Sequence, residues 1–573
     1  MYMDKYRVWL DGEYFDQDTK DELKAISDDL VEIEDRFYKD LEFGTGGLRG
    51  ILGAGTNRMN VYTVRKAAQG LANFIVSSGA DAMKKGVAIA YDSRNMSKEF
   101  AMESAKIFTG NGIKVYLYDS LRATPQLSFA VRELGTFSGV MVTASHNPKQ
   151  YNGYKVYGED GGQLPLESAE IVLSEMENIE DISTVKFIEE DEAFSSGLLE
   201  IIGEEIDRKY LDCLKTLSIN KEVCVSVGKD MEIVYTPLHG TGNIPVRRIL
   251  DEVGFKNVIV VPEQELPDGN FSTVRSPNPE ERDALNLAIE LAKKESSDIV
   301  IGTDPDGDRV GVAVRKPDGE YQILNGNQTG CLLMEYVLSQ KKEKGELPSN
   351  GFVVKTIVTT ELSRDIASYY GAELVEVLTG FKFIGEQIKL LDDEGDKKFI
   401  FGYEESFGYL AGTFVRDKDA IVSSMLIAEM TAYYASKGMS LYDALIAMFD
   451  KYGYVLEGSK SITLEGVEGL RKISSAMEYM RETDIDSFGS HNVIRRRDYQ
   501  SSMTSDGAKI ELPKSNVIYY ELSDGAWCCV RPSGTEPKIK FYVGVKTGSL
   551  LESEKDVNDV IDAMEDSIKH ILY

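Results

Sequence analysis

Residues 139–148, GVMVTASHNP, place a run of apolar residues directly before a polar turn. The same arrangement recurs in GVAIAYDSR, IKVYLYDS, MEIVYTPLHGTG, SDIVIGTDPDGD and KKFIFGYEESFG. Helical patterning follows several of these runs, as in EFAMESAKIFTGNG and ERDALNLAIELAKKE. Such alternation is typical of βα units and predicts an α/β fold with parallel or mixed sheets.

The length of the chain predicts several domains. A single hydrophobic core does not serve 573 residues, and changes in composition suggest boundaries that give residues 1–205, 206–323, 324–455 and 456–573. The alternation of apolar runs and amphipathic stretches extends through the first three regions. The last region, with SNVIYYELSDGAWCCVRPSGTEPKIKFYVGVKT and one amphipathic helix after it, reads as a smaller α+β domain.

Charge and cysteine content restrict the classes of function. The 64 basic and 95 acidic residues give a formal charge of −31, which argues against nucleic acid and anionic membranes as partners. An acidic protein of this kind can still bind an anionic substrate through a locally basic pocket. The five cysteines form no CxxC pair, and no apolar run reaches the length of a membrane helix, so we expect a cytoplasmic protein with reduced thiols.

A tight loop, GTDPDGDRVG at residues 302–311, has the composition of a cation site. Asp304, Asp306 and Asp308 offer hard oxygen ligands on alternate residues, as Mg²⁺ or Ca²⁺ requires. Arg315 stands where an EF-hand would carry its bidentate glutamate, so that class is not supported. A cation beside Arg309 favours phosphoryl chemistry over calcium buffering, although a solvated acidic turn is the alternative.

The TASHNP turn at residues 143–148 allows three interpretations of Ser145: a nucleophile, a helix cap or part of a polar turn. Neither a GxSxG elbow nor SxxK spacing is present, since position 148 is Pro148, so acyl transfer has no specific support. Lys155 follows in a strand-like segment. A lysine beside this serine acts as a base or holds a phosphate carried by it.

Two further loops carry polar groups suited to a sugar phosphate. GYEESFG offers Glu404 and Ser406 for hydrogen bonds to sugar hydroxyls, and RPSGTEPK offers an arginine fork, hydroxyls and backbone amides for a phosphate. Solvated acidic residues and an ordinary hairpin turn are the alternatives. The early glycine-rich stretch has no GxGxxG register, because Arg49 stands at the third glycine, so a dinucleotide site is not supported.

Together, TASHNP with YNGYK, DPDGDR, EES and RPSGTEPK resemble the α-D-phosphohexomutase superfamily, in the same order and over about residues 40–545. YEESFGYL and VRDKDA are most similar to the longer branch, which includes bacterial α-phosphoglucomutases and phosphopentomutase-like enzymes. The resemblance implies four domains around a central cleft, of which the first three are similar mixed-sheet α/β domains and the fourth is a smaller C-terminal α+β domain. It also implies a transferable phosphoryl group on Ser145, next to His146.

The resemblance carries further roles onto this chain. Asp304, Asp306 and Asp308 would hold Mg²⁺ with an oxygen of the Ser145 phosphate, which Arg309 would contact, and Lys155 would be the general base or acid. Glu404 and Ser406 would bind sugar hydroxyls. The remaining positions would bind the non-reacting phosphate or support the cleft: Arg531, Ser533, Gly534 and Thr535 for the phosphate, and Arg49, Thr379, Gly380, Lys382 and Lys418 for the cleft.

The implied activity is the interconversion of α-D-glucose 1-phosphate and glucose 6-phosphate, with glucose 1,6-bisphosphate as activator and intermediate. Phosphopentomutase or phosphomannomutase activity is the alternative within the class. A Mg²⁺-dependent sugar-phosphate phosphatase and a non-catalytic sugar-phosphate-binding protein are alternatives from other classes. Small sugar phosphates are the expected partners, with neither nucleic acid nor membrane, and we expect a monomer or dimer.

Overall fold

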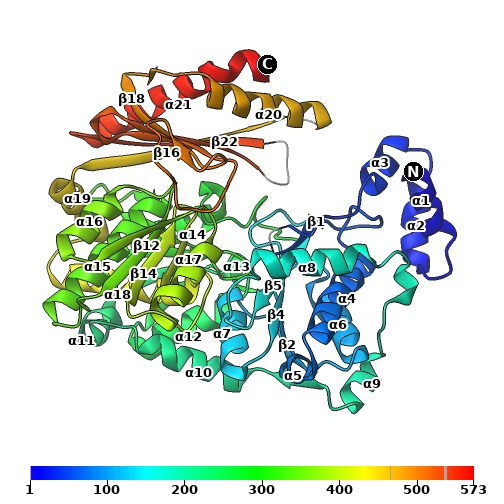
Figure 1. The fold of residues 1–573 in the computed structure, drawn as a ribbon. Coiled ribbons are helices and arrows are strands. Elements are labelled where there is room, and N and C mark those ends of the chain that lie inside the picture. The colour runs from blue at the N-terminus through cyan, green and yellow to red at the C-terminus, as the bar shows by residue number, and fades with distance from the viewer. Residues whose placement is uncertain (1, 45, 465, 534–537) are drawn as a thin grey trace. The chain divides into compact units, whose positions relative to one another are not determined.

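The computed structural model of the 573-residue chain describes every residue except 1, 45, 465 and 534–537 (Figure 1). The chain divides into two compact units. The first contains Met1–Leu324, Gly385–Phe399 and Ser406–Ser440, and the second contains Asn325–Ile384, Ile400–Glu405 and Leu441–Tyr573. In the part of the chain that is described, no helix combines the length and the apolar character needed to cross a membrane.

Three short helices, α1 (Tyr2–Asp11), α2 (Gln17–Ala25) and α3 (Leu30–Phe37), precede the first sheet. They share a small aromatic core in which Trp9 stacks on Phe15 at 4.5 Å and meets Tyr62 edge-on at 5.3 Å. These helices were not among the elements predicted from the sequence. Tyr62 lies in α4 (Val61–Ser77), so the same aromatic contacts pack the three helices against the first α/β layer.

The first sheet has six strands in the order β1-β5-β4-β2-β3-β6. Strands β3, β2, β4 and β6 run parallel, whereas β5 is antiparallel to β4 and β1. All five residues of β4 are buried, which accounts for its continuous apolar sequence. The bounds are β1 Gly47–Ile51, β2 Val87–Tyr91, β3 Val115–Tyr118, β4 Ser138–Val142, β5 Tyr151–Gly158 and β6 Leu199–Ile202, with helices α4 Val61–Ser77, α5 Ala80–Lys85, α6 Ser97–Gly110, α7 Thr124–Leu134, α8 Leu166–Glu177 and α9 Glu190–Ser195.

The second sheet has five strands in the order β11-β10-β9-β7-β8. Its parallel strands β8, β7 and β9 are followed by two antiparallel strands, so that β9 and β10 form a hairpin closed by the aspartate loop. The bounds are β7 Glu232–Thr236, β8 Asn257–Val260, β9 Ile299–Thr303, β10 Val310–Arg315 and β11 Tyr321–Leu324, with helices α10 Glu204–Lys215, α11 Lys221–Ser226, α12 Asn243–Val253, α13 Pro262–Glu265 and α14 Arg282–Glu295.

The third sheet has four strands in the order β13-β12-β14-β15, with β12 and β13 parallel. It again combines buried strands with helices, as α15 and α18 carry long apolar stretches. The bounds are β12 Gly351–Thr356, β13 Glu373–Val377, β14 Lys398–Glu404 and β15 Gly408–Ala411, with helices α15 Gly326–Glu343, α16 Leu362–Tyr370, α17 Phe381–Ile388, α18 Ala420–Ser436 and α19 Leu441–Tyr452.

The fourth sheet has the order β16-β22-β21-β20-β18-β17, with β19 beside β18, and its strands pair antiparallel. Cys528 and Cys529 of β21 are both fully buried and belong to different apolar clusters, as expected for adjacent residues on opposite faces. The bounds are β16 Tyr454–Thr463, β17 Ser487–Phe488, β18 His491–Asp498, β19 Met503–Thr504, β20 Ile518–Leu522, β21 Trp527–Pro532 and β22 Lys538–Thr547, with helices α20 Gly466–Glu482 and α21 Leu550–Leu572.

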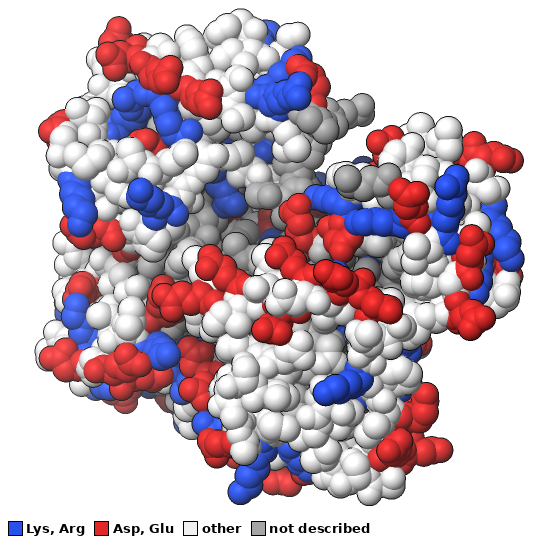
Figure 2. Space-filling view, turned by 45° about the vertical axis from the view of Figure 1, so that its right-hand side comes forward, with Lys and Arg blue, Asp and Glu red and all other residues white. Residues whose placement is uncertain are grey.

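The predicted fold class is confirmed: three α/β layers built on mixed sheets are followed by a smaller α+β layer with an antiparallel sheet. The boundaries at 205, 323 and 455 stay predictions. Acidic and basic side chains are interspersed on the face shown in Figure 2, with several adjoining acidic groups, in keeping with the formal charge of −31.

Candidate active site

Ser145 lies in the turn between β4 and β5, where the parallel part of the first sheet ends. Its backbone adopts a left-handed conformation, with φ of 52°, and only 3% of the residue is exposed. The Ser145 N–H donates to Thr143 Oγ1 at 2.7 Å, and Thr143 Oγ1 donates to Asp92 Oδ2 at 2.6 Å. The TASHNP segment therefore forms a polar turn that is anchored, through Thr143, to the buried carboxylate of Asp92.

Arg94 organises the same turn, and sequence reasoning missed it. Its side chain is fully buried and donates to four backbone carbonyls of the turn: those of Pro148 and Tyr151 at 3.1 Å each, and those of Ser145 and Asn147. Arg94 also lies 3.3 Å from Asp92 as an ion pair and stacks over Phe271 at 4.9 Å. The only signal in the sequence is an arginine just after the apolar run GVAIAY.

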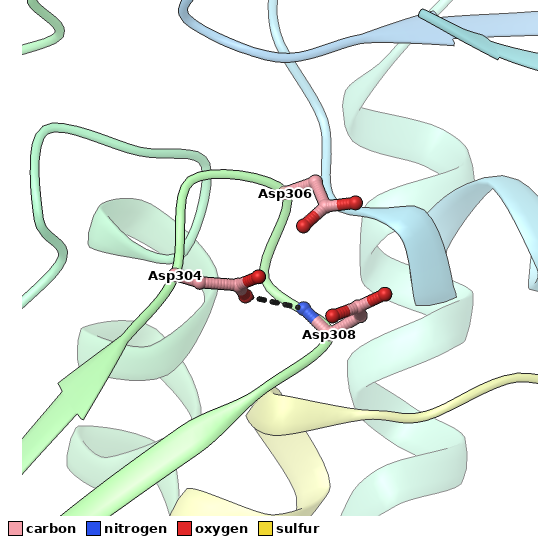
Figure 3. A group of neighbouring side chains, drawn as sticks. All are labelled: Asp304, Asp306 and Asp308. Carbon is pink, nitrogen blue, oxygen red and sulfur yellow. Dashed lines mark hydrogen bonds between the residues drawn. The ribbon is translucent and has the colours of Figure 1, made fainter. Parts of the chain in front are cut away.

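Asp304, Asp306 and Asp308 occupy the β9–β10 hairpin loop, and their carboxylates converge (Figure 3). One oxygen from each lies within 4.8 Å of the others, and all three side chains are buried. The backbone N–H groups of Asp308 and Arg309 donate to Asp304 Oδ1 at 3.0 and 2.9 Å. The hairpin thus holds the first carboxylate in place, while its second oxygen remains available to another group.

That second oxygen meets the serine. Ser145 Oγ donates to Asp304 Oδ2 at 2.8 Å, which joins two loops that are 159 residues apart in the chain. Thr124, at the start of α7, donates from its N–H to the Asp306 carbonyl at 2.8 Å and from Oγ1 to Asp306 Oδ2 at 3.1 Å. The predicted serine and the predicted aspartates therefore form one cluster.

The carboxylates fit a hard divalent cation. Asp306 Oδ1 and Asp308 Oδ1 are buried and accept no hydrogen bond from any residue that the structure describes. Buried carboxylate oxygens in this condition are costly unless a cation neutralises them. The donor set consists of hard oxygens, as Mg²⁺ prefers.

Two lysines contact the other oxygens of the same carboxylates. Lys155 of β5 donates to Asp306 Oδ2 at 2.8 Å and lies 3.4 Å from Asp308 Oδ2, and Lys418 lies 3.2 Å from Asp308 Oδ2. Burial lowers the pKa of Lys155, but Asp306 and Asp308 more than offset this and raise it above its ordinary value. The Lys155 ammonium therefore carries its proton at neutral pH.

The charges around the cluster shift the pKa values of Asp304 and Asp308 in opposite directions. Burial acts to raise the pKa of Asp308, but Lys418, Lys155 and Arg309 hold it below its ordinary value. Among the described residues, no lysine pairs with Asp304, and burial together with the charges of Asp306 and Asp308 raises its pKa well above the ordinary value. The carboxyl nearest to Ser145 is thus the one in the cluster that most favours a proton or a bound cation.

His146 and Arg49 lie beside the serine turn. His146 Nδ1 lies 3.2 Å from Ser145 Oγ, and burial followed by the charges of Arg309 and Arg49 lowers the pKa of His146, so its ring is neutral at pH 7. Arg49 is exposed on β1 and donates to Asn147 Oδ1 at 3.3 Å. Its role as a supporting residue of the cleft stays a prediction.

Arg309 follows the aspartate loop directly. Its guanidinium pairs with Glu280, and its Nε lies 3.9 Å from Asp308 Oδ1. The predicted contact with a phosphate on Ser145 is not tested by this geometry and stays a prediction.

A segment of the second domain also reaches the serine turn, and sequence reasoning missed it. Ser276 Oγ donates to the His146 carbonyl at 2.8 Å, and Asn95 Nδ2 donates to Asn270 Oδ1 at 3.1 Å. Phe271, which packs under Arg94, has a positive φ of 46°. Residues 268–280 therefore help to enclose Ser145, and nothing in their sequence indicated this.

The predicted sugar loop begins at the end of β14. Glu404 is 5% exposed, Ser406 is half-buried in the turn after it, and Glu405 Oε2 accepts from Thr356 Oγ1 at 3.3 Å. The supporting positions Thr379 and Gly380 precede α17 in a turn where Gly380 has φ of 123°, and Lys382, in the first turn of α17, lies over the Phe383 ring at 5.0 Å. Their roles stay predictions.

The predicted phosphate loop is described only in part. Arg531 lies near the end of β21, opposite Lys540 of β22, and the Ser533 N–H donates to the Lys538 carbonyl at 2.7 Å. Gly534 and Thr535 lie outside the described residues. Burial raises the pKa of Tyr542, Glu405 raises it further and Arg531 opposes this, so the acidic loop and the arginine act on one tyrosine of the second unit.

Models of one family match the chain along most of its length. The descriptions are phosphoglucomutase/phosphomannomutase, alpha/beta/alpha domain I at residues 40–183, domain II at 208–319, domain III at 325–452 and the C-terminal domain at 491–559. Each of the four motifs found in the sequence falls inside one of these domains. TASHNP lies in domain I, DPDGDR in domain II, EES in domain III and RPSGTEPK in the C-terminal domain.

Individual proteins agree with these matches. A phosphoglucomutase of Staphylococcus haemolyticus is 38% identical over 92% of this chain and 94% of its own length, and one of Staphylococcus aureus MRSA252 is 37% identical over 94% and 97%. Two solved structures share the fold. They are pp63/parafusin (phosphoglucomutase) of Paramecium, with TM-score 0.67, 15% identity and coverage of 93% and 96%, and a family protein of Burkholderia thailandensis, with TM-score 0.64, 17% identity and coverage of 92% and 97%.

Proposed function

Because this chain belongs to the phosphoglucomutase/phosphomannomutase family, we propose that it interconverts α-D-glucose 1-phosphate and glucose 6-phosphate. The observation that carries the proposal is the 2.8 Å hydrogen bond from Ser145 Oγ to Asp304, inside a cluster of three convergent carboxylates. A serine oxygen beside a cation site suits a phosphoryl carrier.

The serine shuttles the phosphoryl group. A phosphate on Ser145 passes to the free hydroxyl of the sugar: the bond from phosphorus to Ser145 Oγ breaks and a bond from phosphorus to the sugar oxygen forms. The sugar hydroxyl gives up its proton and Ser145 Oγ takes one up, so the serine hydroxyl is restored. The product is glucose 1,6-bisphosphate. After the sugar turns over, its other phosphoryl group returns to Ser145 Oγ and the isomerised monophosphate leaves.

Asp304, Asp306 and Asp308 would hold Mg²⁺, since two of their buried oxygens accept no hydrogen bond within the described chain. When bound, the ion neutralises charge on the transferring phosphoryl oxygens. Lys155 carries its proton, and we assign it the role of general acid towards the oxygen that leaves phosphorus. Lys418, a second cationic group, pairs with Asp308 and comes from the segment before α18, far from Lys155 in the sequence.

Recognition of the sugar phosphate rests on the remaining loops. Glu404 and Ser406 are assigned to the sugar hydroxyls, and Arg531 and Ser533, with Gly534 and Thr535, to the phosphate that does not react. Thr379 Oγ1 is buried and makes no hydrogen bond to the described residues, which suits a polar ligand group at that position. Arg49, Gly380 and Lys382 complete the proposed set of supporting residues.

Burial of Ser145 favours a mutase over a phosphatase. With 3% of the residue exposed, attack by bulk water on a phosphate at this position is restricted, whereas a sugar hydroxyl bound in place is not. Phosphopentomutase and phosphomannomutase activities remain the alternatives within the family. The proposed setting is cytoplasmic, with a monomer or dimer acting on small sugar phosphates.

One experiment tests these assignments together. The 1-phosphates of glucose, mannose and ribose are supplied separately with Mg²⁺ and the matching bisphosphate, and both the isomerised product and free phosphate are measured. We expect glucose 1-phosphate to give the highest kcat/KM and little free phosphate. A preference for ribose or mannose would reassign the substrate, and dominant release of phosphate would refute the mutase.

A further inference from the structure

A cavity lined by residues drawn from 4–66 and 173–183 lies between the N-terminal helices and the first α/β layer. Its volume is about 890 Å³, within the range of small-molecule sites. One wall comes from α1 and residues 12–15, the floor from residues 40–42 and α4, and the other wall from the end of α8 through residue 183. The lining residues between Asp4 and Phe15 precede residue 40, where the match to the family models begins.

The cavity is held open by a rigid frame. Trp9 lines it and is at the same time fixed by Phe15, Phe37 and Tyr62, with ring centroids 4.5 to 5.8 Å away. On the floor, Lys5 and Lys66 both contact Asp40, at 2.6 and 3.1 Å, which joins α1 to α4 across the base. The site is therefore built from packed side chains before any ligand enters.

The inner surface is largely apolar. Trp9, Leu173 and Met176 line the cavity, and Val8, also part of the lining, remains 62% exposed. Covering an exposed apolar surface of this kind with an apolar ligand lowers the free energy by about 25 cal/mol per Å². A ligand with an aromatic or aliphatic body meets this requirement.

The charged residues around the cavity indicate which ligand charge it favours. Seven acidic residues line it against two lysines, and both lysines already pair with Asp40. Glu13, Glu177 and Glu180 form no ion pair with any residue in the described chain. Sugar phosphates, nucleotides and fatty acids would bring negative charge close to these acidic residues, so the cavity is unsuited to a second substrate phosphate.

We propose that this cavity binds an organic cation: a small molecule with an apolar body that fills the space over Val8 and Trp9 and an ammonium group that faces Glu13, Glu177 and Glu180. The site is separate from the proposed sugar-phosphate chemistry, and its occupancy does not depend on that function.

The test uses three probes of one size and different charge: 4-phenylbutylamine, 4-phenylbutanol and 4-phenylbutyrate. Binding is followed by calorimetry on the unmodified chain and by Trp9 fluorescence in a Trp527→Phe background, since the chain has only two tryptophans. At low salt we expect the amine to bind about tenfold more tightly than the carboxylate, with the alcohol between them. Equal binding of all three probes would overturn the proposal.

Matched variants locate the binding. Val8→Phe should weaken the amine at least fivefold by filling the cavity, whereas Val225→Phe, at a position with the same exposure (61% against 62%), should not. Glu177→Gln with Glu180→Gln should weaken the amine about three- to tenfold, and Glu190→Gln on α9 should have no effect. Unchanged affinity in Val8→Phe would show that the amine binds the acidic surface at random. Self-association of the chain that Val8→Phe abolishes, without amine binding, would identify a contact between copies and refute the small-molecule site.

Discussion

Replacing Arg94 by lysine tests whether this residue positions the phosphoryl carrier. The guanidinium donates to four carbonyls spread over seven residues of the serine turn. A lysine keeps the positive charge opposite Asp92, but its donors all sit on one nitrogen, so it cannot reach acceptors at both ends of the turn. The charge is kept while the geometry is lost.

The expected magnitude follows from the hydrogen bonds that a lysine cannot make. Hydrogen bonds from a charged donor contribute about 1.5–3 kcal/mol each. Loss of two of the four, with partial replacement by water, gives a decrease of about 3–5 kcal/mol in the free energy of unfolding. A displacement of about 1 Å at a reacting atom costs on the order of 100-fold in rate, so we expect kcat to fall about 100-fold with a change in KM of less than about threefold.

The assay couples glucose 6-phosphate formation to a dehydrogenase, and urea unfolding measures stability. Leu71→Ala is the matched control, because Leu71 is fully buried in α4 of the same layer and its truncation costs about 2–5 kcal/mol without touching the turn. If Arg94→Lys and Leu71→Ala lose stability equally and both keep kcat, Arg94 is a structural residue and the reasoning is wrong.

Three more predictions concern the cluster and its surroundings. Asp306→Asn should lower kcat about 1,000-fold, and chelation of the wild type should do the same until Mg²⁺ is restored; full activity in chelator would refute the metal assignment. Ser145→Ala should abolish both turnover and the phosphorylated species in intact-mass spectra, while bisphosphate binding by calorimetry persists; residual phosphorylation would point to another carrier. Glu361 is held by the buried Lys355 at 2.7 Å, and although burial opposes it, this partner lowers the pKa of Glu361 to about 2. Because the folded pKa lies below the unfolded one, the stabilisation is present above about pH 4.5 and is lost as pH falls towards 2, so Glu361→Gln should cost about 2 kcal/mol at pH 7 and clearly less at about pH 3 in urea titrations.

The sequence predicts which loops carry chemistry because each follows an apolar strand. In open α/β sheets the carboxyl ends of strands gather at one edge, so Ser145 after β4 and Asp304 after β9 were expected near a common site. The contact between them at 2.8 Å agrees with this expectation. Alternation of short apolar runs and amphipathic stretches likewise suffices for the fold class.

Pairings between distant residues are not predictable in this way. Lys155 meets Asp306 across 151 residues, and Lys418 meets Asp308 from the segment before α18, yet neither pairing follows from local composition. Arg94 was missed for a different reason. It contacts backbone carbonyls, and every residue type offers a carbonyl, so the acceptors leave no mark in the sequence.

The cluster also accounts for how an acidic chain can attract an anionic substrate. A formal charge of −31 repels phosphates at long range, but screening limits this repulsion to roughly 8–10 Å in physiological salt. Closer to the serine, two of the three carboxylates pair with Lys155 and Lys418, and Arg309 lies beside Asp308. A bound divalent cation would make this region positive, because it would add two charges to three cations set against three carboxylates. Specificity for phosphate therefore depends on the local arrangement of these few groups, and the acidic exterior is free to serve solubility.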